Sequence, residues 1–447
     1  MLGSRVGEGQ NQSQDTVAAP VELYCQAFAE FLTGLTDEPS PDIVTRTKEM
    51  MITVDKIATK EDTRSELTRT LSNIISYGIY QNVALYSQTS PPYETVALII
   101  FEEKSEMGNG GCDPTAQASY SYERFWSSPG HQEVLNASCC PSFLVALAGP
   151  WLCVLGAVWT DHAVVQRLTD FLWLGTSPLI DDSRCLNIAR VLSSLGKAVV
   201  TLRHFYASLD TSAPPPGTLP RCLSPCINSY YTGRSESDRD HPTLPAAGPV
   251  TLYPRRPAES DEEVEFDYIR PLGSYRACTT FLAVRKSDER RVVVKFVARY
   301  GTDAHRLLEK EGLAPELVYA GHILSRGTDG KLRKMYNNLF MVVMAYVEGI
   351  TLADRFAFSA LPKEIVEQVE RAMTLLHGAG LVYGDLCRPN VMVTGEGKVQ
   401  LVDFDWAGKE GVVRYPSFIS NERRWASGVQ SYAIIKAEHD QEMLSRF

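Results

Sequence analysis

The chain has 447 residues, of which 44% are hydrophobic and 22% charged, and its formal net charge is −10 at pH 7. This length predicts two or three domains, and the composition is that of an ordinary globular protein rather than a disordered or fibrous one. The acidic balance argues against a protein whose main role is to coat nucleic acid. Its ten cysteines lack paired metal-ligand spacing, which indicates reduced thiols in an intracellular, cytoplasmic or nuclear protein.

Residues 1–20 are polar, and we expect them to be disordered. They also lack the apolar core of a signal peptide. An α/β domain is expected over residues 21–209. A buried strand is expected at Thr95–Glu103, and a helix that starts with Asp113 as its cap and Pro114 in its first turn. Apolar residues at helical spacing predict further helices over 21–35, 62–76 and 182–209.

The segment Phe143–Trp159 contains seventeen residues without a charge. It is at the short limit for a membrane-spanning helix. Gly149 and Pro150 divide it into two halves of strand length, which favours two buried strands joined by a turn. We therefore expect no transmembrane helix and no membrane partner.

The end of the first expected strand carries Glu102 and Lys104, and the following helix carries Gln117 and Tyr120. This arrangement resembles the restriction-endonuclease-like core, in which an acid binds Mg²⁺ and a lysine orients the attacking water. The resemblance implies a nucleic-acid partner for this domain. The family expects a further acid on the preceding strand, where only Glu94 is available. The alternative interpretation is a solvated strand end.

Residues 210–260 are rich in proline, serine and charge without periodicity, which predicts a linker. A second domain is expected over 261–447, beginning with an antiparallel strand pair at Thr279–Val284 and Arg291–Val297. Lys295 lies in the middle of the second strand. An ammonium group in such an apolar wall needs a polar partner.

The stretch after residue 380 contains Asp385, then Asn390 five residues later, and then an alternating strand that leads to Asp403. A kinase catalytic loop has this order of residues. Phosphoryl transfer needs one carboxylate for the attacking hydroxyl, and an amide and a second carboxylate for Mg²⁺. A loop followed by a hairpin brings all three side chains together.

From Phe266 onward the chain resembles the fungal-type protein kinase family, through the motifs VVVKFVARYG, YGDLCRPN and VDFDWAG. The N-terminal half resembles the domain that precedes this kinase in fungal and Crinkler-like proteins. The resemblance implies an α+β protein-kinase-like C-terminal domain, with a β-rich N-lobe and a shortened helical C-lobe, preceded by the α/β domain. It also implies ATP and Mg²⁺ as cofactors and the Ser/Thr hydroxyls of an unknown protein as substrate.

The resemblance assigns each role to a residue of this chain. Asp385 positions the hydroxyl, Asn390 and Asp403 bind Mg²⁺, and Lys295 holds the phosphates. The family register gives Lys295 an acidic partner on the next helix. Asp303 is the choice for that partner, with Glu309 and Glu311 as alternatives. The same register places Met344 at the back of the nucleotide pocket and Tyr346 in the hinge beside the adenine.

Several positions depart from the family pattern. Cys387 stands where kinases have a lysine or arginine that stabilises the transferring phosphate, and Arg388 next to it is expected to reach that site. Asp405 replaces a glycine of the metal motif. Asp440 resembles the residue that anchors the catalytic loop, and the sequence ends seven residues later, which predicts the shortened lobe.

Two alternatives to a protein kinase therefore stay open. One is a pseudokinase that binds nucleotide as an interaction module attached to the nuclease-like domain. The other is a kinase-like enzyme that phosphorylates a small molecule.

Overall fold

The computed structural model divides the chain into two compact units, each described by itself. One comprises Met1–Asn228 with two short later segments, and the other comprises Ser229–Gly273, Thr279–Lys334 and Asn338–Phe447. The structure describes residues 18–54, 61–76, 86–87, 96–104, 113–176, 182–210, 217, 219–232, 262–273, 278–326, 332–336, 339–357, 359–420 and 423–447. The expected disorder of residues 1–17, Glu94 and much of the expected linker lie outside this set.

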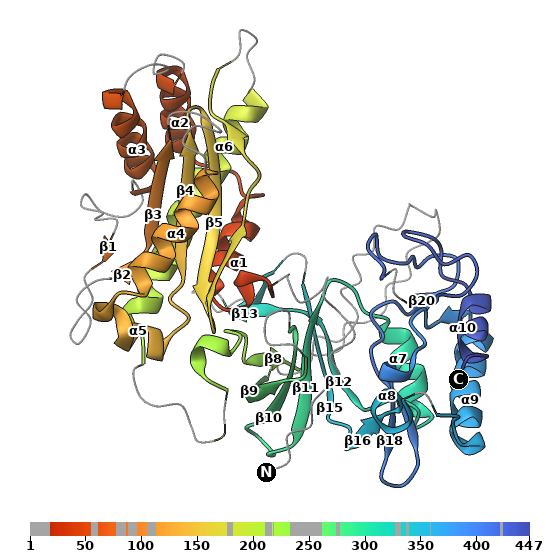
Figure 1. Cartoon of the computed structure of the whole chain (residues 1–447). Coiled ribbons are helices and arrows are strands. Elements are labelled where there is room, and N and C mark those ends of the chain that lie inside the picture. Colours follow the sequence, from red (N-terminus) through yellow and green to blue (C-terminus); the bar gives the residue numbers. More distant parts are fainter. Residues whose placement is uncertain are drawn as a thin grey trace, which may run out of the picture. The chain divides into compact units, whose positions relative to one another are not determined.

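The N-terminal unit is built on a mixed five-stranded sheet (Figure 1). Its first two strands are parallel, and the other pairings are antiparallel. The strands are β3 (Ile99–Lys104), β4 (Ser142–Ala148), β5 (Trp151–Trp159), β6 (Ala163–Arg167) and β7 (Leu172–Trp173). A separate pair, β1 (Tyr86–Ser87) and β2 (Val96–Ala97), completes the described strands of this unit.

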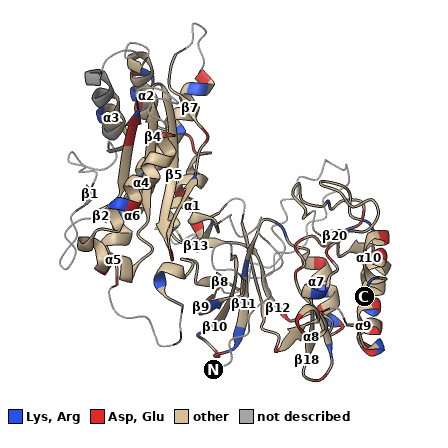
Figure 2. Cartoon of the chain, viewed as in Figure 1, with Lys and Arg blue, Asp and Glu red and all other residues tan. Residues whose placement is uncertain are grey.

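The apolar segment Phe143–Trp159 forms the hairpin β4–β5, as the sequence predicts. Ser142 pairs with Ala157 and Ala148 with Trp151, and every residue of β4 is buried. Gly149 turns the chain with φ 55°, a conformation that glycine adopts without a Cβ penalty. Neither strand carries a charge, and both are tan throughout in Figure 2.

Helices cover both faces of this sheet. On one face, α4 packs along β3 and β4 (Figure 1), and it begins as predicted, because the Asp113 side chain accepts a hydrogen bond from the Thr115 N–H at 2.7 Å. On the other face, Phe28 of α1 lies edge-on to Phe143 at 4.9 Å between ring centroids. The helices are η1 (Val21–Leu23), α1 (Gln26–Gly34), α2 (Pro41–Val54), α3 (Glu61–Ser76), α4 (Pro114–Trp126), η2 (Pro129–His131), α5 (Gln132–Ala137), α6 (Asp182–Ala207) and η3 (Arg221–Leu223).

The long helix α6 is, among the described helices, the one whose length and hydropathy satisfy the criteria for a membrane span. Half of its apolar window is buried inside the protein. It packs against α1, α2 and α3, and Ser194 of α6 donates a hydrogen bond to the Phe31 carbonyl at 2.7 Å. These are the contacts of a core helix.

Residues 18–20 are ordered against this unit, although the sequence predicts disorder up to residue 20. Ala19 is buried. The Gln166 side chain donates hydrogen bonds to the carbonyls of Ala18 at 3.1 Å and Ala19 at 3.0 Å. A polar side chain on β6 thus satisfies the backbone of the incoming chain.

The C-terminal unit begins with a six-stranded antiparallel sheet in the order β12-β15-β11-β10-β9-β8. The predicted pair is present, with Lys295 of β11 opposite Thr280 of β10 and Val342 of β15. The strands are β8 (Ser229–Tyr231), β9 (Glu263–Pro271), β10 (Thr280–Arg285), β11 (Arg291–Val297), β12 (Leu317–His322) and β15 (Phe340–Ala345). Strand β8 lies within the segment 210–260, which the sequence predicts to be a linker. It pairs with β9, and this pairing buries Tyr230 and Tyr231.

Several of the helices and short strands that follow share one core with the segment that carries Asp385 and Asp403. Leu308 of α7, Val369 and Leu376 of α9, Tyr383 and Phe404 belong to it. The helices are α7 (Thr302–Lys310), α8 (Leu352–Phe356), α9 (Lys363–Gly378), η4 (Arg388–Asn390) and α10 (Ala437–Leu444). The short strands are β13 (Leu324–Arg326), β14 (Leu332–Lys334), β16 (Gly349–Thr351), β17 (Leu381–Val382), β18 (Val391–Thr394), β19 (Val399–Leu401) and β20 (Gly408–Lys409).

Candidate active site

The loop that carries Asp385 is anchored by a buried carboxylate on α10. Asp440 accepts hydrogen bonds from the backbone N–H groups of Tyr383 and Gly384, both at 2.8 Å. The His377 ring lies 3.1 Å from the same carboxylate. The anchoring role expected for Asp440 is confirmed, and it holds the backbone directly before Asp385 in one conformation.

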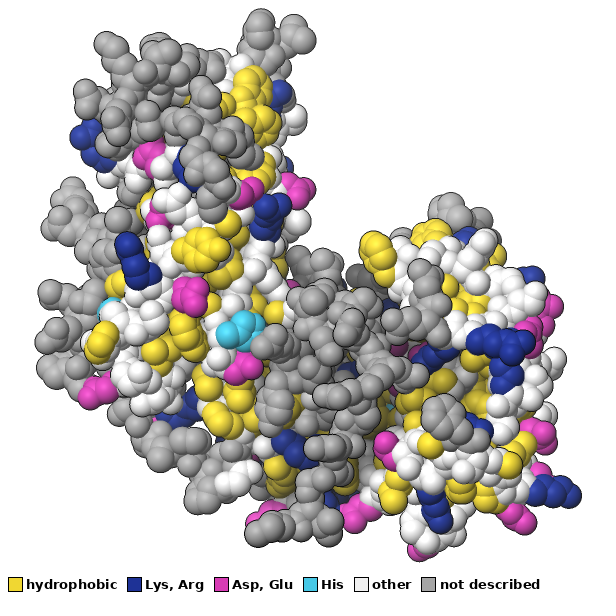
Figure 3. All heavy atoms as spheres, in the orientation of Figure 1, with side chains coloured by type: hydrophobic (Ala, Val, Ile, Leu, Met, Phe, Trp, Pro, Cys, Tyr) yellow, Lys and Arg dark blue, Asp and Glu magenta, His cyan; other side chains and the backbone are white. Residues whose placement is uncertain are grey.

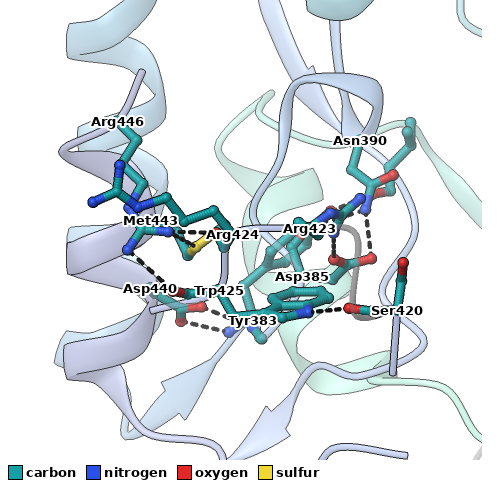
Figure 4. A network of polar contacts seen from close by, with 12 residues as sticks. Tyr383, Asp385, Asn390, Ser420, Arg423, Arg424, Trp425, Asp440, Met443 and Arg446 are labelled. Carbon is teal, nitrogen blue, oxygen red and sulfur yellow. Dashed lines mark hydrogen bonds and ion pairs between the residues drawn. The ribbon is translucent and has the colours of Figure 1, made fainter. Parts of the chain in front are cut away.

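Asp385 is engaged at both of its carboxylate oxygens. The Asn390 amide donates to Oδ2 at 3.0 Å and to the Asp385 carbonyl at 3.0 Å. The Arg423 guanidinium forms an ion pair with Oδ1 (Figure 4). Burial raises the pKa of Asp385 to about 6, although Arg423 opposes the shift and Asp403 adds to it. A carboxyl with this pKa changes protonation state close to neutral pH, as a group that handles protons requires.

Lys295 of β11 reaches the Asp403–Asp405 segment. Its ammonium group donates to Asp403 Oδ1 at 2.9 Å and to Asp405 Oδ1 at 2.7 Å, and the residue is 9% exposed. Burial alone would lower the pKa of Lys295, but the two carboxylates outweigh it and raise that pKa. One cation cannot neutralise two neighbouring carboxylates, and partial burial together with Asp403 raises the pKa of Asp405 to about 7.

Asp403 and Asn390 are brought together by the hairpin β18–β19. The N–H of Val402 donates to the Asn390 carbonyl at 3.0 Å, and the Tyr383 hydroxyl donates to the Val402 carbonyl. Asp403 itself has φ 67°, an uncommon conformation for a residue with a Cβ. Such local strain persists only where the surrounding structure fixes the backbone.

The residue between the two aspartates supplies that support. Phe404 is fully buried, stacked on His305 of α7 at 4.5 Å and edge-on to Tyr383 at 5.4 Å. The His305 ring is within hydrogen-bonding distance of the Tyr300 hydroxyl at 2.6 Å and the Pro315 carbonyl at 2.8 Å. Burial lowers its pKa to about 4, so this ring is neutral at physiological pH.

The expectation that Asp303 pairs with Lys295 is wrong. Asp303 is exposed in the first turn of α7, and His305 fills the inward position against Phe404. The alternative acids have other partners, Glu309 with Arg306 and Glu311 with Arg371. Asp405, an unusual acid in the metal motif, provides the second carboxylate for Lys295 instead.

The Arg388 side chain is engaged by backbone carbonyls in this structure, and its expected role toward the transferring phosphate stays a prediction. Its guanidinium donates to the carbonyls of Ala357 at 2.6 Å, Ser359 at 3.0 Å and Phe447 at 3.4 Å. Three carbonyl partners hold this side chain at the end of α8 and beside the last residue. Arg423 is the basic residue that contacts Asp385, and sequence reasoning did not find it.

The two residues expected around the adenine lie at the end of β15. Met344 is buried opposite Val293 and Leu317. The Tyr346 N–H donates to the Arg291 carbonyl at 3.2 Å, and the Arg291 guanidinium lies 5.2 Å from the Tyr346 ring. Their roles toward a nucleotide stay predictions.

The chemistry of the donor set fits Mg²⁺. Asp403 and Asp405 share a single ammonium group, so the pair retains capacity for a second cation. Among the described residues there is no cluster of three or more His, Cys, Asp or Glu side chains that has the geometry of a metal site. Mg²⁺ is usually held by one or two carboxylates, with waters and substrate phosphates as its other ligands.

The strand end that carries the nuclease-like residues of the N-terminal unit has hydrogen-bond partners on the neighbouring helices. Glu102 accepts a hydrogen bond from Ser121 of α4, and Glu103 accepts one from Thr68 of α3 at 2.6 Å. Tyr120 is 67% exposed. Lysine and arginine side chains on the face of this unit seen in Figure 3 lie singly among acidic and apolar ones. A nucleic-acid partner, and the roles of Glu102, Lys104 and Gln117, stay predictions.

Comparisons with known proteins find similar sequences over part of the chain. The sequence profile of the family described as lipopolysaccharide core biosynthesis protein (WaaY) matches residues 329–416, a range that includes Asp385, Asn390 and Asp403. The chain is 27% identical to a serine/threonine-protein kinase (drp72) of Corynebacterium efficiens over 28% of its length and 26% of the kinase. It is 24% identical to the serine/threonine-protein kinase PAK mbt of Drosophila melanogaster, over 33% of its length and 23% of the kinase.

A third relative, the probable serine/threonine-protein kinase mkcF of Dictyostelium discoideum, is 28% identical over 30% of this chain and 21% of the kinase. The chain thus spans about a quarter of the length of the curated relatives it matches. Part of the chain is similar in sequence to serine/threonine protein kinases, and the mixed α and β architecture of the C-terminal unit agrees with the expected fold class.

Proposed function

We propose that the C-terminal unit is an ATP- and Mg²⁺-dependent phosphotransferase of the protein kinase type. The observation that carries the proposal is the Lys295–Asp403 ion pair at 2.9 Å, because it joins the strand lysine to the hairpin that also bonds Asn390. Asp385 and Asn390 in one loop, Asp403 after β19 and Lys295 on β11 therefore converge from three separate stretches of sequence. Their chemistry matches the parts that phosphoryl transfer requires.

Each residue has a defined task in the reaction. Asp385 accepts a hydrogen bond from the substrate hydroxyl and takes its proton as the oxygen attacks the γ-phosphorus. A bond forms between this oxygen and phosphorus, the bond to the bridging oxygen of ADP breaks, and ADP leaves with that electron pair. Lys295 binds the α- and β-phosphates. The amide of Asn390 keeps the Asp385 carboxylate oriented toward the hydroxyl.

Asn390 and Asp403, with Asp405 beside them, would hold Mg²⁺. When bound, this ion neutralises the charge on the phosphate oxygens. The strained φ of Asp403 and the packing of Phe404 support the role, because they fix the carboxylate on the side where Lys295 lies.

The proposed acceptor is a serine or threonine hydroxyl of a protein, by similarity to the named kinases, and the proposed group is the fungal-type protein kinases. Transfer of the γ-phosphate from labelled ATP tests the activity, with the full chain itself and a mixture of basic proteins as acceptors. We expect Mg²⁺-dependent label on protein, and loss of it in Asp385→Ala and Asp403→Ala. Label unchanged in both variants would contradict the proposal.

A pseudokinase is the second candidate. In this conformation Asn390 and Arg423 occupy both carboxylate oxygens of Asp385. This favours a pseudokinase, because the carboxylate that would accept the substrate hydroxyl is already occupied. Mg²⁺-dependent ATP binding that Asp403→Ala weakens, with no transfer to any acceptor, would support this candidate over the enzyme.

A further inference from the structure

The catalytic loop lacks the basic residue that its own chemistry calls for. Charge develops on the oxygens of the transferring phosphoryl group, and a cation beside them stabilises the transition state. Cys387 is a buried neutral side chain, and burial raises the pKa of its thiol to about 12. Arg388 is turned away to the carbonyls at the end of α8.

Arg423 supplies a cation at this place from a distant part of the sequence. It lies 38 residues after Asp385, its Nη1 donates to Asp385 Oδ1, and its side chain is only partly exposed. Its guanidinium interacts with both Asp385 and the Cys387 side chain, and these contacts raise its pKa against the effect of burial.

The segment around Arg423 is held by Arg446, which lies just after α10. Arg446 donates to the carbonyls of Arg424 and Trp425, the latter at 3.1 Å (Figure 4). The Trp425 indole donates to the Ser420 carbonyl at 2.7 Å. The Arg423 guanidinium lies 4.7 Å from the centre of the Trp425 ring.

The segment 437–446 therefore fixes two groups at once. Asp440 on α10 holds the loop of Asp385, and Arg446, just after the end of the helix, holds the segment of Arg423. A cation positioned in this way does not need to reorganise when charge develops on a substrate, which is the condition for strong electrostatic catalysis.

We propose that Arg423 binds the transferring phosphoryl group and replaces, from this downstream segment, the cation that position 387 lacks. The inference deepens the proposed phosphotransferase function and rests on it. The guanidinium has five N–H donors, so a bond from Nη1 to Asp385 leaves donors for phosphoryl oxygens. When the hydroxyl proton passes to Asp385, that carboxylate becomes neutral and attracts Arg423 less strongly. The guanidinium then interacts mainly with the oxygens of the γ-phosphoryl group during its transfer.

The first test uses binding rather than turnover. ADP with Mg²⁺ and aluminium fluoride mimics the planar phosphoryl group in transfer, whereas ADP with Mg²⁺ lacks it. We expect Arg423→Ala to weaken binding of the fluoride complex about 100-fold and to change binding of Mg²⁺–ADP less than about threefold. Arg424→Ala is the matched control, because it removes the same charge from an exposed neighbouring side chain.

The outcomes separate the inference from the proposed function. Equal binding of the fluoride complex by the wild-type chain and Arg423→Ala, with Mg²⁺–ADP bound by both, overturns the inference alone. Failure of the wild-type chain to bind Mg²⁺–ADP overturns the proposed function together with it. A faster rate of phosphate transfer in Arg423→Ala would also overturn the inference, because it would identify Arg423 as an inhibitory clamp on Asp385.

A second variant restores the cation at its usual place. In the Arg423→Ala background, Cys387→Lys introduces an ammonium group two residues after Asp385. We expect this double variant to recover at least tenfold of the lost affinity for the fluoride complex. A purely structural role for Arg423 predicts no recovery, since the ammonium group introduced by Cys387→Lys would not restore the packing against Trp425.

Discussion

The carboxylate of Asp440 accepts the backbone N–H of Gly384 at 2.8 Å, directly before Asp385. Replacement of this carboxylate by an amide turns one acceptor into a donor that faces a buried N–H. We expect Asp440→Asn to reduce the local free energy of opening of the loop by about 1 to 3 kcal/mol and to lower kcat.

Hydrogen exchange of the Tyr383 and Gly384 amides measures this change. Glu438→Gln, on an exposed side chain of the same helix, is the control and should leave both amides protected. Unchanged protection in Asp440→Asn would show that the loop keeps its conformation without this anchor.

The rate of transfer should depend on pH through Asp385. Its raised pKa of about 6 means that the carboxylate loses its capacity to accept the hydroxyl proton as pH falls through 6. We expect log(kcat/KM) plotted against pH to have an acidic limb below about pH 6, with a slope of one. Arg423→Ala should move this limb to higher pH, because Arg423 favours the charged form of Asp385. A limb at the same pH in both proteins would contradict the assignment.

Asp405 should tune the demand for Mg²⁺ rather than provide the essential ligand. Asp405→Asn removes one of the two carboxylates that share Lys295 and leaves Asp403 in place. We expect the Mg²⁺ concentration for half-maximal ATP binding to rise several-fold, whereas Asp403→Asn should abolish the Mg²⁺ dependence. Isothermal titration at several Mg²⁺ concentrations distinguishes the two, and identical behaviour of both variants would refute the distinction.

His305 should make the free energy of unfolding of this unit decrease at acidic pH. Its folded pKa of about 4 lies below the ordinary value of 6.5, so the unfolded chain binds more protons between these pH values and stability falls as pH decreases through this window. At pH 4.5 the loss is about 2 to 3 kcal/mol relative to pH 7. His305→Phe keeps a ring against Phe404 but removes this titration.

Hydrogen exchange of α7 amides at the two pH values measures the difference. The raised pKa of Asp385 acts in the opposite direction in both proteins, so the comparison of wild type with His305→Phe isolates the histidine. An equal pH dependence in the two proteins would mean that His305 is not the group responsible.

Much of the site could be predicted because its residues are close in sequence or lie in regular elements. Asp385, Asn390 and Asp403 occupy one loop and one hairpin, whose geometry follows from local pattern. Lys295 lies in a strand with unmistakable β-branched neighbours. The turn at Gly149 is equally local.

The other features of the site depend on long-range contacts, which no local sequence pattern encodes. Arg423 lies in an irregular segment without periodicity, and its neighbours Arg424 and Trp425 are held by long-range hydrogen bonds from Arg446. The direction of Arg388 depends on carbonyls at the end of α8. Nor could the sequence decide between Asp303 and Asp405 as partner of Lys295, because that choice depends on which residue of α7 packs on Phe404.

The variant Asp385→Asn separates nucleotide binding from phosphate transfer. Asp385→Asn keeps the shape of the side chain but cannot take the hydroxyl proton. With Mg²⁺ and labelled ATP under single-turnover conditions, we predict ATP affinity within about threefold of wild type and a transfer rate lower by about 100-fold or more. Transfer by Asp385→Asn at the wild-type rate would contradict the account of this unit as a phosphotransferase that uses Asp385.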